Sequence, residues 1–145
     1  MIDRLSSCPL AVSMAEAQAY ARVETGEEEA LLAGLVRSAN AYCEAFTGQV
    51  LVMREFVEVL AAGDYAIDID ARGDGWVRVT TLVEGRIRVG GQAGIASEPN
   101  GVPEPLRQGI LRLVAHLFQA RDGGGGEPPA AVTAMWRPYR RMRLA

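Results

Sequence analysis

The chain has 145 residues, of which 49% are hydrophobic and 23% charged, and this balance is typical of an ordinary globular domain. A chain of this length can bury the core of one domain without disulfides or a structural metal. The sequence contains no apolar run of about 18 residues and no signal-peptide pattern at its start. We therefore expect a protein of a reducing cytoplasm without a membrane span, in which Cys8 and Cys43 are thiols.

The charge is unevenly distributed. The formal net charge is −3, but residues 123–145 carry four arginines against Glu127, about +3, which leaves about −6 for residues 1–122. An acidic body with a basic tip lacks the continuous positive stripe of a general nucleic-acid binder. All basic residues are arginines, which excludes a phosphate-binding loop with its lysine. The pattern favours docking on a particular partner.

Two helices are predicted in the first third of the chain. Ser13 and Glu16 have the spacing of a capping box, which predicts a helix over about residues 14–23. A second helix should begin at the glutamates of 27–29 and stop at Gly48. Its apolar face is predicted from residues that recur at three- and four-residue steps: Leu31, Leu35, Ala39, Tyr42 and Phe46.

From residue 49 the hydrophobic period changes to two. The stretches "LVMREFVEVL", "YAIDIDA", "WVRVTTLV" and "RIRV" read as strands separated by glycine-containing breaks at hairpin-like distances. The following "GGQAGIASEPNGVPEP" reads as a turn-rich connection. A small antiparallel sheet is therefore predicted between the second and third helices, over about residues 49–95.

The third helix should start near Pro103 and Pro105 and be central to the fold. Gly109 within it costs about 1 kcal/mol relative to alanine, which indicates a close approach by another element. Beyond a four-glycine stretch, a fourth helix begins and is ended or kinked by Pro138. The apolar face of the third helix is predicted from Leu106, Ile110, Leu113, Val114 and Leu117, widened by Leu111, Ala115 and Phe118.

These elements predict a mainly α fold. It has a four-helix core, a small antiparallel β insertion between the second and third helices, and a hinged C-terminal helix and tail. The domain organisation that follows is a helical domain over residues 1–122, with the insertion at about 49–95. Residues 123–145 form a glycine hinge and a C-terminal docking segment.

No constellation of residues indicates an active site. His116, the only histidine, lies among apolar residues of the third helix, and no serine has the G-x-S-x-G surroundings of a nucleophile. Asp68, Asp70 and Asp74 are spaced loosely like a calcium loop, but Arg72 intrudes among them and the bidentate glutamate is missing. We predict no catalytic residue, no cofactor and no metal.

The C-terminal segment stands out in residue type. Arginine, tryptophan and tyrosine dominate binding hot spots, and here they gather within eight residues. The glycine stretch would let the segment reorient until a partner fixes it. In an alternative interpretation the fourth helix packs on the domain through Val132, Met135 and Trp136, and the arginines stay in water. The candidate partner-binding residues are Trp136, Arg137, Tyr139, Arg140, Arg141 and Arg143.

The order of these segments resembles the small head-tail connector proteins, also called adaptor or head-completion proteins, of long-tailed phages, prophages and gene transfer agents. The resemblance covers nearly the whole chain, and its most specific parts are the third helix and the closing "PYRRMRL". The segments that carry it are "SMAEAQAYARV", "EEEALLAGLVRSANAYCEAFTG", "VPEPLRQGILRLVAHLFQAR" and "PPAAVTAMWRPYRRMRL".

The resemblance implies a structural role without enzymatic activity. Such proteins form a ring, usually dodecameric, between the portal of a DNA-filled capsid and the stopper or tail proteins. Their C-terminal segment reaches the portal, so the candidate residues above become candidate portal contacts. DNA would pass through the ring without specific binding, and the acidic body would repel it. We expect a monomer in isolation at low concentration, a ring on the portal, assembly in the host cytoplasm and a final place in the virion.

Two other readings of the sequence stay open. One is a small cytoplasmic helical regulatory or DNA-binding domain with an arginine tail, whose binding to random duplex DNA would fall steeply with salt. The other is a small hydrolase that uses His116 with a carboxylate, and this reading requires that His116→Ala abolish a measurable activity.

Overall fold

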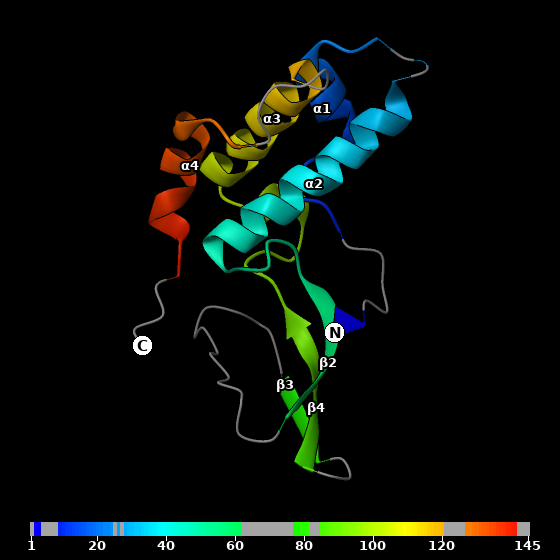
Figure 1. Ribbon diagram of the computed structural model, residues 1–145, viewed down its shortest axis with the longest axis vertical. Helices are drawn as coiled ribbons and strands as arrows, with labels where there is room; N and C mark the ends of the chain where they lie inside the picture. The colour runs from blue at the N-terminus through cyan, green and yellow to red at the C-terminus, as the bar shows by residue number, and fades with distance from the viewer. Residues whose placement is uncertain are drawn as a thin grey trace.

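The structure is a computed structural model that describes residues 2–3, 9–24, 26, 28–61, 77–81, 85–120 and 127–141. The helices gather at one end of the molecule and an antiparallel sheet projects from them (Figure 1). The helices are α1 (Met14–Ala21), α2 (Glu29–Thr47), α3 (Glu104–Gln119) and α4 (Ala130–Trp136), with short 3-10 helices η2 (Pro99–Gly101) and η3 (Arg137–Tyr139). The mostly helical fold and the sheet between α2 and α3 are as predicted.

The sheet has the strand order β1-β2-β4-β3, and every neighbouring pair is antiparallel. Its strands are β1 (Ile2–Asp3), β2 (Arg54–Ala61), β3 (Val77–Thr81) and β4 (Arg86–Ala93). The start of the chain therefore adds a short edge strand to the sheet. The sequence pattern had predicted that residues of about 49–95 form the whole sheet. The strand predicted over 65–71 lies outside the described residues.

Part of the predicted turn-rich connection is strand. The backbone of β4 continues through Gly90–Ala93 and pairs with β2 in unbroken register, from Ala93 opposite Arg54 to Arg86 opposite Ala61. A Cβ added at Gly90 would lie 3.3 Å from the carbonyl oxygen of Phe56, so the missing side chain lets the strands approach. Gly90 thus serves close strand packing, and the reading as a turn was wrong for residues 90–93.

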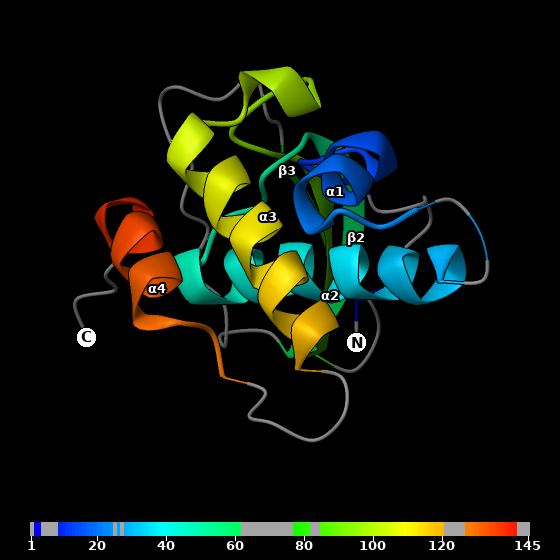
Figure 2. The same cartoon turned by 90° about the horizontal axis from the view of Figure 1, so that it is seen from above.

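Helix α3 is the centre of the helical end. It crosses α2, while α1 and α4 pack on α3 from opposite sides (Figure 2). Four of the residues predicted to form its main apolar face, Leu106, Ile110, Leu113 and Val114, are at most 1% exposed, which confirms the predicted central position. The buried core comprises Ala11, Val12, Ala17, Leu32, Val36, Ala39, Cys43, Leu51, Val52, Ala96, Val102, Leu106, Ile110, Leu111, Leu113, Val114, Val132 and Trp136.

The predicted apolar face of α2 was wrong at two positions. Leu31 and Tyr42 are 42% and 43% exposed. The core instead receives a stripe displaced by one position, which consists of Leu32, Val36, Ala39, Asn40, Cys43 and Thr47. Two overlapping apolar stripes run along this helix, and the packing of α1 and α3 selects one of them.

Helix ends follow the local chemistry of the sequence. At the start of α1 the hydroxyl of Ser13 accepts a hydrogen bond from the backbone N–H of Glu16 (3.1 Å), and the Glu16 carboxylate accepts one from the N–H of Ser13 (2.8 Å). The predicted capping box is thus confirmed. Helix α2 stops at Gly48, as predicted, in a left-handed conformation with φ 68° that favours glycine.

Buried polar groups hold the N-terminal segment, Pro9–Ser13, on the helices. The side-chain oxygen of Asn40 on α2 accepts a hydrogen bond from the N–H of Ala11 (3.0 Å), and Arg107 on α3 donates to the carbonyl of Ala11 (3.0 Å). The same guanidinium pairs with Glu16 and with Glu104. Both backbone groups of Ala11 are thereby satisfied inside the protein, as burial of the segment requires.

Candidate partner-binding surface

Helix α4 is anchored to the core by one large side chain. Trp136 is 0% exposed, and its indole N–H donates to the carbonyl of Leu106 on α3 (3.3 Å). A Cβ added at Gly109 would lie only 2.8 Å from Cε2 of this ring, so Gly109 provides the space for the tryptophan. The close approach predicted at Gly109 is confirmed, and the approaching element is α4.

This packing decides between the two readings of the fourth helix. Val132 is 1% exposed and Met135 packs against the core, so the interpretation in which α4 docks through Val132, Met135 and Trp136 is the one the structure shows. The prediction of Trp136 as a direct partner contact does not fit this structure, because its whole side chain is already buried. The glycines of 123–126 lie outside the described residues.

Beyond α4 the chain runs along the C-terminal end of α2. The N–H of Arg141 donates to the carbonyl of Thr47 (2.9 Å), and the side-chain amide of Gln49 donates to the carbonyl of Tyr139. The last carbonyls of a helix carry a partial negative charge, so arginines near this end are favourably placed. The C-terminal segment, Arg137–Arg141, therefore has a fixed backbone path.

The structure brings Arg140 of this segment close to an aromatic residue of α2. The guanidinium carbon of Arg140 lies 5.5 Å from the centre of the Phe46 ring. Phe46 and Tyr42 in turn lie beside Trp136, with ring centres 6.0 and 6.5 Å from it. We call this region the aromatic–arginine surface, and it consists of Tyr42, Phe46, Arg137, Tyr139 and Arg140.

The predicted partner-binding residues differ in solvent exposure. Arg137 and Arg140 are exposed, whereas Tyr139 and Arg141 are half-buried. Arg143 lies outside the described residues. Tyr42 and Phe46 were missed as site residues because their spacing indicated the core. Tyr42 could have been identified from the two apolar stripes of α2, because only one of these stripes can face the core and the other must be exposed.

The last turn of α2 also anchors the start of the sheet. The carboxylate of Glu44 accepts two hydrogen bonds from the guanidinium of Arg54, both 2.9 Å long, and one from the N–H of Leu51 (3.1 Å). The two side chains are 12% and 17% exposed, and paired charged hydrogen bonds are among the stronger polar contacts. One helical turn thus binds the C-terminal segment and the strand β2.

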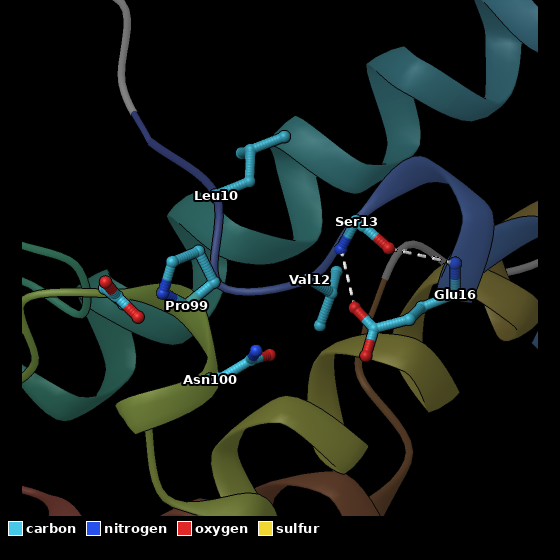
Figure 3. A pocket seen from close by; sticks show the side chains of 7 residues that line it. Leu10, Val12, Ser13, Glu16, Pro99 and Asn100 are labelled. Carbon is cyan, nitrogen blue, oxygen red and sulfur yellow. Dashed lines mark hydrogen bonds between the residues drawn. The ribbon is translucent and has the colours of Figure 1, made fainter.

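A pocket of about 360 Å³ lies beside the N-terminus of α1 (Figure 3). Its polar groups include the capping-box residues Ser13 and Glu16, while Val12 and Pro99 give apolar contacts. The backbone hydrogen bond from Ser13, together with contacts to Arg107, holds the pKa of the Glu16 carboxyl below its usual range. Because both carboxylate oxygens of Glu16 already accept hydrogen bonds, their role is to hold the fold. The pocket is lined by Leu10, Val12, Ser13, Glu16, Glu98, Pro99 and Asn100.

The remaining candidates for catalysis or metal binding are His116, three aspartates and the cysteine Cys43. His116 is half-buried on α3, and Asp68, Asp70 and Asp74 lie outside the described residues. Burial raises the pKa of the Cys43 thiol to about 12, so it stays protonated and unreactive at neutral pH. Among the described residues, no group of three or more histidines, cysteines and carboxylates could hold a metal ion. Likewise, no helix in the described ranges is long and apolar enough to cross a membrane.

The fold is shared with proteins in solved structures of gene transfer agents. A chain in the virion of a native gene transfer agent particle is 21% identical, with a TM-score of 0.76. A chain in the neck of an empty particle, computed with C6 symmetry, is 21% identical with a TM-score of 0.71, and one in the neck of a native particle, computed with C12 symmetry, is 19% identical with a TM-score of 0.70. Each alignment covers 100% of this chain and 97% of the other. No protein-family model and no curated protein sequence matches the chain.

Proposed function

We propose that this protein is a structural component of the neck of a phage-like or gene transfer agent particle. The observation that carries the proposal is the end-to-end likeness to neck and virion proteins, which covers all of this chain and 97% of each relative. In this proposal the protein acts through its interfaces and has no enzymatic role. It is made in the host cytoplasm and ends in the virion at the head-tail junction.

Within the neck, we propose that the protein forms an adaptor ring between the portal and the tail-side or stopper proteins. The neck structures of the relatives were computed with C6 and C12 symmetry, which supports a ring of repeated subunits. We propose that this ring has twelve subunits. Subunits in a ring touch through two different surfaces, and such contacts close only when the rotation closes. The isolated protein would be a monomer at low concentration.

The proposed portal contact is the C-terminal docking segment of residues 123–145. Its candidate residues are now Arg137, Tyr139, Arg140 and Arg141, whose positions are known, together with Arg143. Trp136 acts indirectly, because it fixes α4 on the domain of residues 1–122. DNA would pass through the ring without specific binding, next to a body with a net charge of about −6.

The test of this function is particle assembly with a charge-reversed segment. Arg137→Glu with Arg140→Glu, introduced into the genome that encodes this chain, should yield DNA-filled heads and free tails that do not join. Counts of tailed and tailless particles by electron microscopy measure the effect. Arg37→Glu, at an exposed position of α2, is the matched control and should assemble normally. Normal numbers of joined particles from the double variant would contradict the portal contact.

A second measurement distinguishes the DNA-binding alternative. Binding of the purified protein to random duplex DNA should be absent at moderate salt if the segment serves a protein partner. Tight binding that weakens steeply as salt is raised would instead indicate neutralised phosphates and favour the regulatory or DNA-binding reading.

A further inference from the structure

The aromatic–arginine surface is continuous across two parts of the chain. Tyr42 and Phe46 come from α2, one helical turn apart, and both contact the ring of Trp136 from the outside of the core. Arg140 lies over the Phe46 ring. Arg140 of the C-terminal segment and Phe46 of α2 therefore lie next to each other, beside the ring contacts of Trp136.

Tyr42 has the character of a binding anchor. Its side chain is 43% exposed, although its ring lies beside a tryptophan that is fixed by a hydrogen bond and by the space at Gly109. A tyrosine held against a rigid neighbour loses little rotamer freedom when a partner covers it. Tyrosine and arginine are also the residue types that carry most of the binding energy in protein interfaces.

The charges of the surface define the chemistry of its occupant. Arg137 and Arg140 are exposed, and within the described part of the chain neither forms an ion pair. The carboxylate of α2 nearest in sequence to Phe46 is Glu44, which is already bound to Arg54 and to the N–H of Leu51. Among the described residues the two guanidinium groups therefore have no carboxylate partner, and groups of this kind bind carboxylates with two hydrogen bonds at once.

The backbone of the surface is ordered before any partner arrives. Hydrogen bonds at Tyr139 and Arg141 fix the C-terminal segment to the end of α2. A preformed surface avoids the entropy cost of ordering a loose tail on binding. Recognition by this part of the chain is therefore docking onto a fixed surface, in contrast to the folding of a flexible arm.

We propose that the aromatic–arginine surface binds an acidic segment of a partner protein, with Tyr42 as the apolar anchor and Arg140 as the carboxylate-binding residue. This inference rests on the proposed function, in which the partner is the portal. An acidic peptide that carries an apolar side chain satisfies both the rings and the guanidinium groups. Duplex DNA satisfies only the guanidinium groups, and the two exposed arginines in the described part of the segment are fewer than the several phosphate contacts of a DNA-binding protein.

The test measures the affinity of purified portal rings from the same particle for single-residue variants. Tyr42→Ala and Arg140→Ala should each raise the Kd at least about tenfold, which is the size expected for hot-spot residues. Arg140→Lys should fall between Arg140→Ala and the wild type, because it keeps the charge but loses the planar group. Tyr20→Ala, at a tyrosine that is 40% exposed on α1, and Arg37→Ala are the matched controls and should change the Kd less than about twofold.

A footprint on the unmodified protein gives a reading that is independent of folding defects. Hydroxyl radicals should oxidise Tyr20 and Tyr42 to similar extents in the free protein, since their exposed fractions are 40% and 43%. Portal rings should protect Tyr42 and leave Tyr20 reactive. Equal protection of both residues, or of neither in a complex that forms, would overturn the assignment of this surface.

The outcomes separate failure of the inference from failure of the function. If the wild type binds portal rings while Tyr42→Ala and Arg140→Ala bind equally well, the inference is wrong and the neck function stands. If the wild type does not bind portal rings, the proposed portal contact and the inference both fail. If the same variants weaken binding to random duplex DNA and leave portal binding unchanged, the occupant is nucleic acid and the acidic-segment proposal is overturned.

Discussion

The N-terminal segment, Pro9–Ser13, and the C-terminal segment, Arg137–Arg141, both lie against α2, but their polar groups have different fates. At the N-terminal segment Asn40 and Arg107 bind the two backbone groups of Ala11, and Arg107 is further occupied by carboxylates of this chain. At the C-terminal segment the backbone is bound in the same way, yet Arg137 and Arg140 are exposed. At the N-terminal segment the polar groups are thus used to hold the fold, whereas at the C-terminal segment two charged side chains remain exposed on a backbone that is held in place.

The largest effect on stability is expected from removal of Trp136, which anchors α4 and the C-terminal segment to the core. Trp136→Ala leaves a large void among Gly109, Phe46 and Leu106 and should lower the free energy of unfolding by about 3–5 kcal/mol. Denaturant unfolding measures the loss. Arg137→Ala, at the next and exposed position, should change it by less than about 0.5 kcal/mol. A similar small effect for Trp136→Ala would show that α4 is not anchored as described.

A methyl group at Gly109 tests the same contact from the side of α3. Gly109→Ala should cost about 2–3 kcal/mol, although alanine is the better helix former by about 1 kcal/mol, because the new carbon overlaps the indole ring. Gly34→Ala on α2 is the matched control. Its nearest neighbour would be the end of the Arg37 side chain at 3.9 Å, so this variant should gain up to about 1 kcal/mol. Thermal or denaturant unfolding of the pair gives opposite signs if Trp136 fills the space at Gly109.

Loss of Asn40 tests the N-terminal segment. Asn40→Ala leaves the buried N–H of Ala11 without its acceptor and should cost about 2 kcal/mol. Hydrogen exchange should show that the amide of Ala11 loses protection while that of Arg141 keeps it, because the two segments are attached separately. Ser38→Ala, on the exposed side of the same helix, is the control. Equal loss of protection at both amides would mean that the two segments are coupled.

The smallest effect is expected from the charge of Glu16. The pKa of this carboxyl is lowered in the folded protein, so its charge stabilises the fold above the ordinary value of 4.5, and this contribution is lost as the pH falls through the lowered pKa. Glu16→Gln should therefore melt below the wild type at neutral pH, and the gap in Tm should close as the pH is taken below about 4.5. Glu55→Gln, at an exposed position of β2, is the control. A gap that widens on acidification would contradict the assigned direction.

The sequence predicted those features that depend on short-range chemistry. The capping box at Ser13, the stop at Gly48 and the apolar face of α3 are determined by neighbouring residues along one element, and all three are confirmed. The choice between the two apolar stripes of α2 depends on which helices pack against it, so the exposure of Tyr42 could not be read from the helix alone. For the same reason the sequence left open whether Trp136 packs on the domain or contacts a partner, and it did not indicate that a strand from the chain start joins β2.

The partner-binding site stays a prediction, and the structure adds only the positions of its described members. The arginines and Tyr139 were recognised by residue type, and composition alone favoured a flexible arm for them. The docked path of Arg137–Arg141 depends on the carbonyl of Thr47 and the side-chain amide of Gln49, and neither partner can be identified from the local sequence pattern of the segment. Arg140 meets Phe46 across 94 positions of the chain, and a contact of this range follows from the packing of α4.

The last turn of α2 holds two other parts of the chain. The carbonyl of Thr47 is bound to the C-terminal segment, and three positions earlier Glu44 is bound to both Leu51 and Arg54 at the start of β2. The C-terminal segment and the start of β2 are therefore attached to the same helical turn, beside the connection of residues 48–53 that joins α2 to β2.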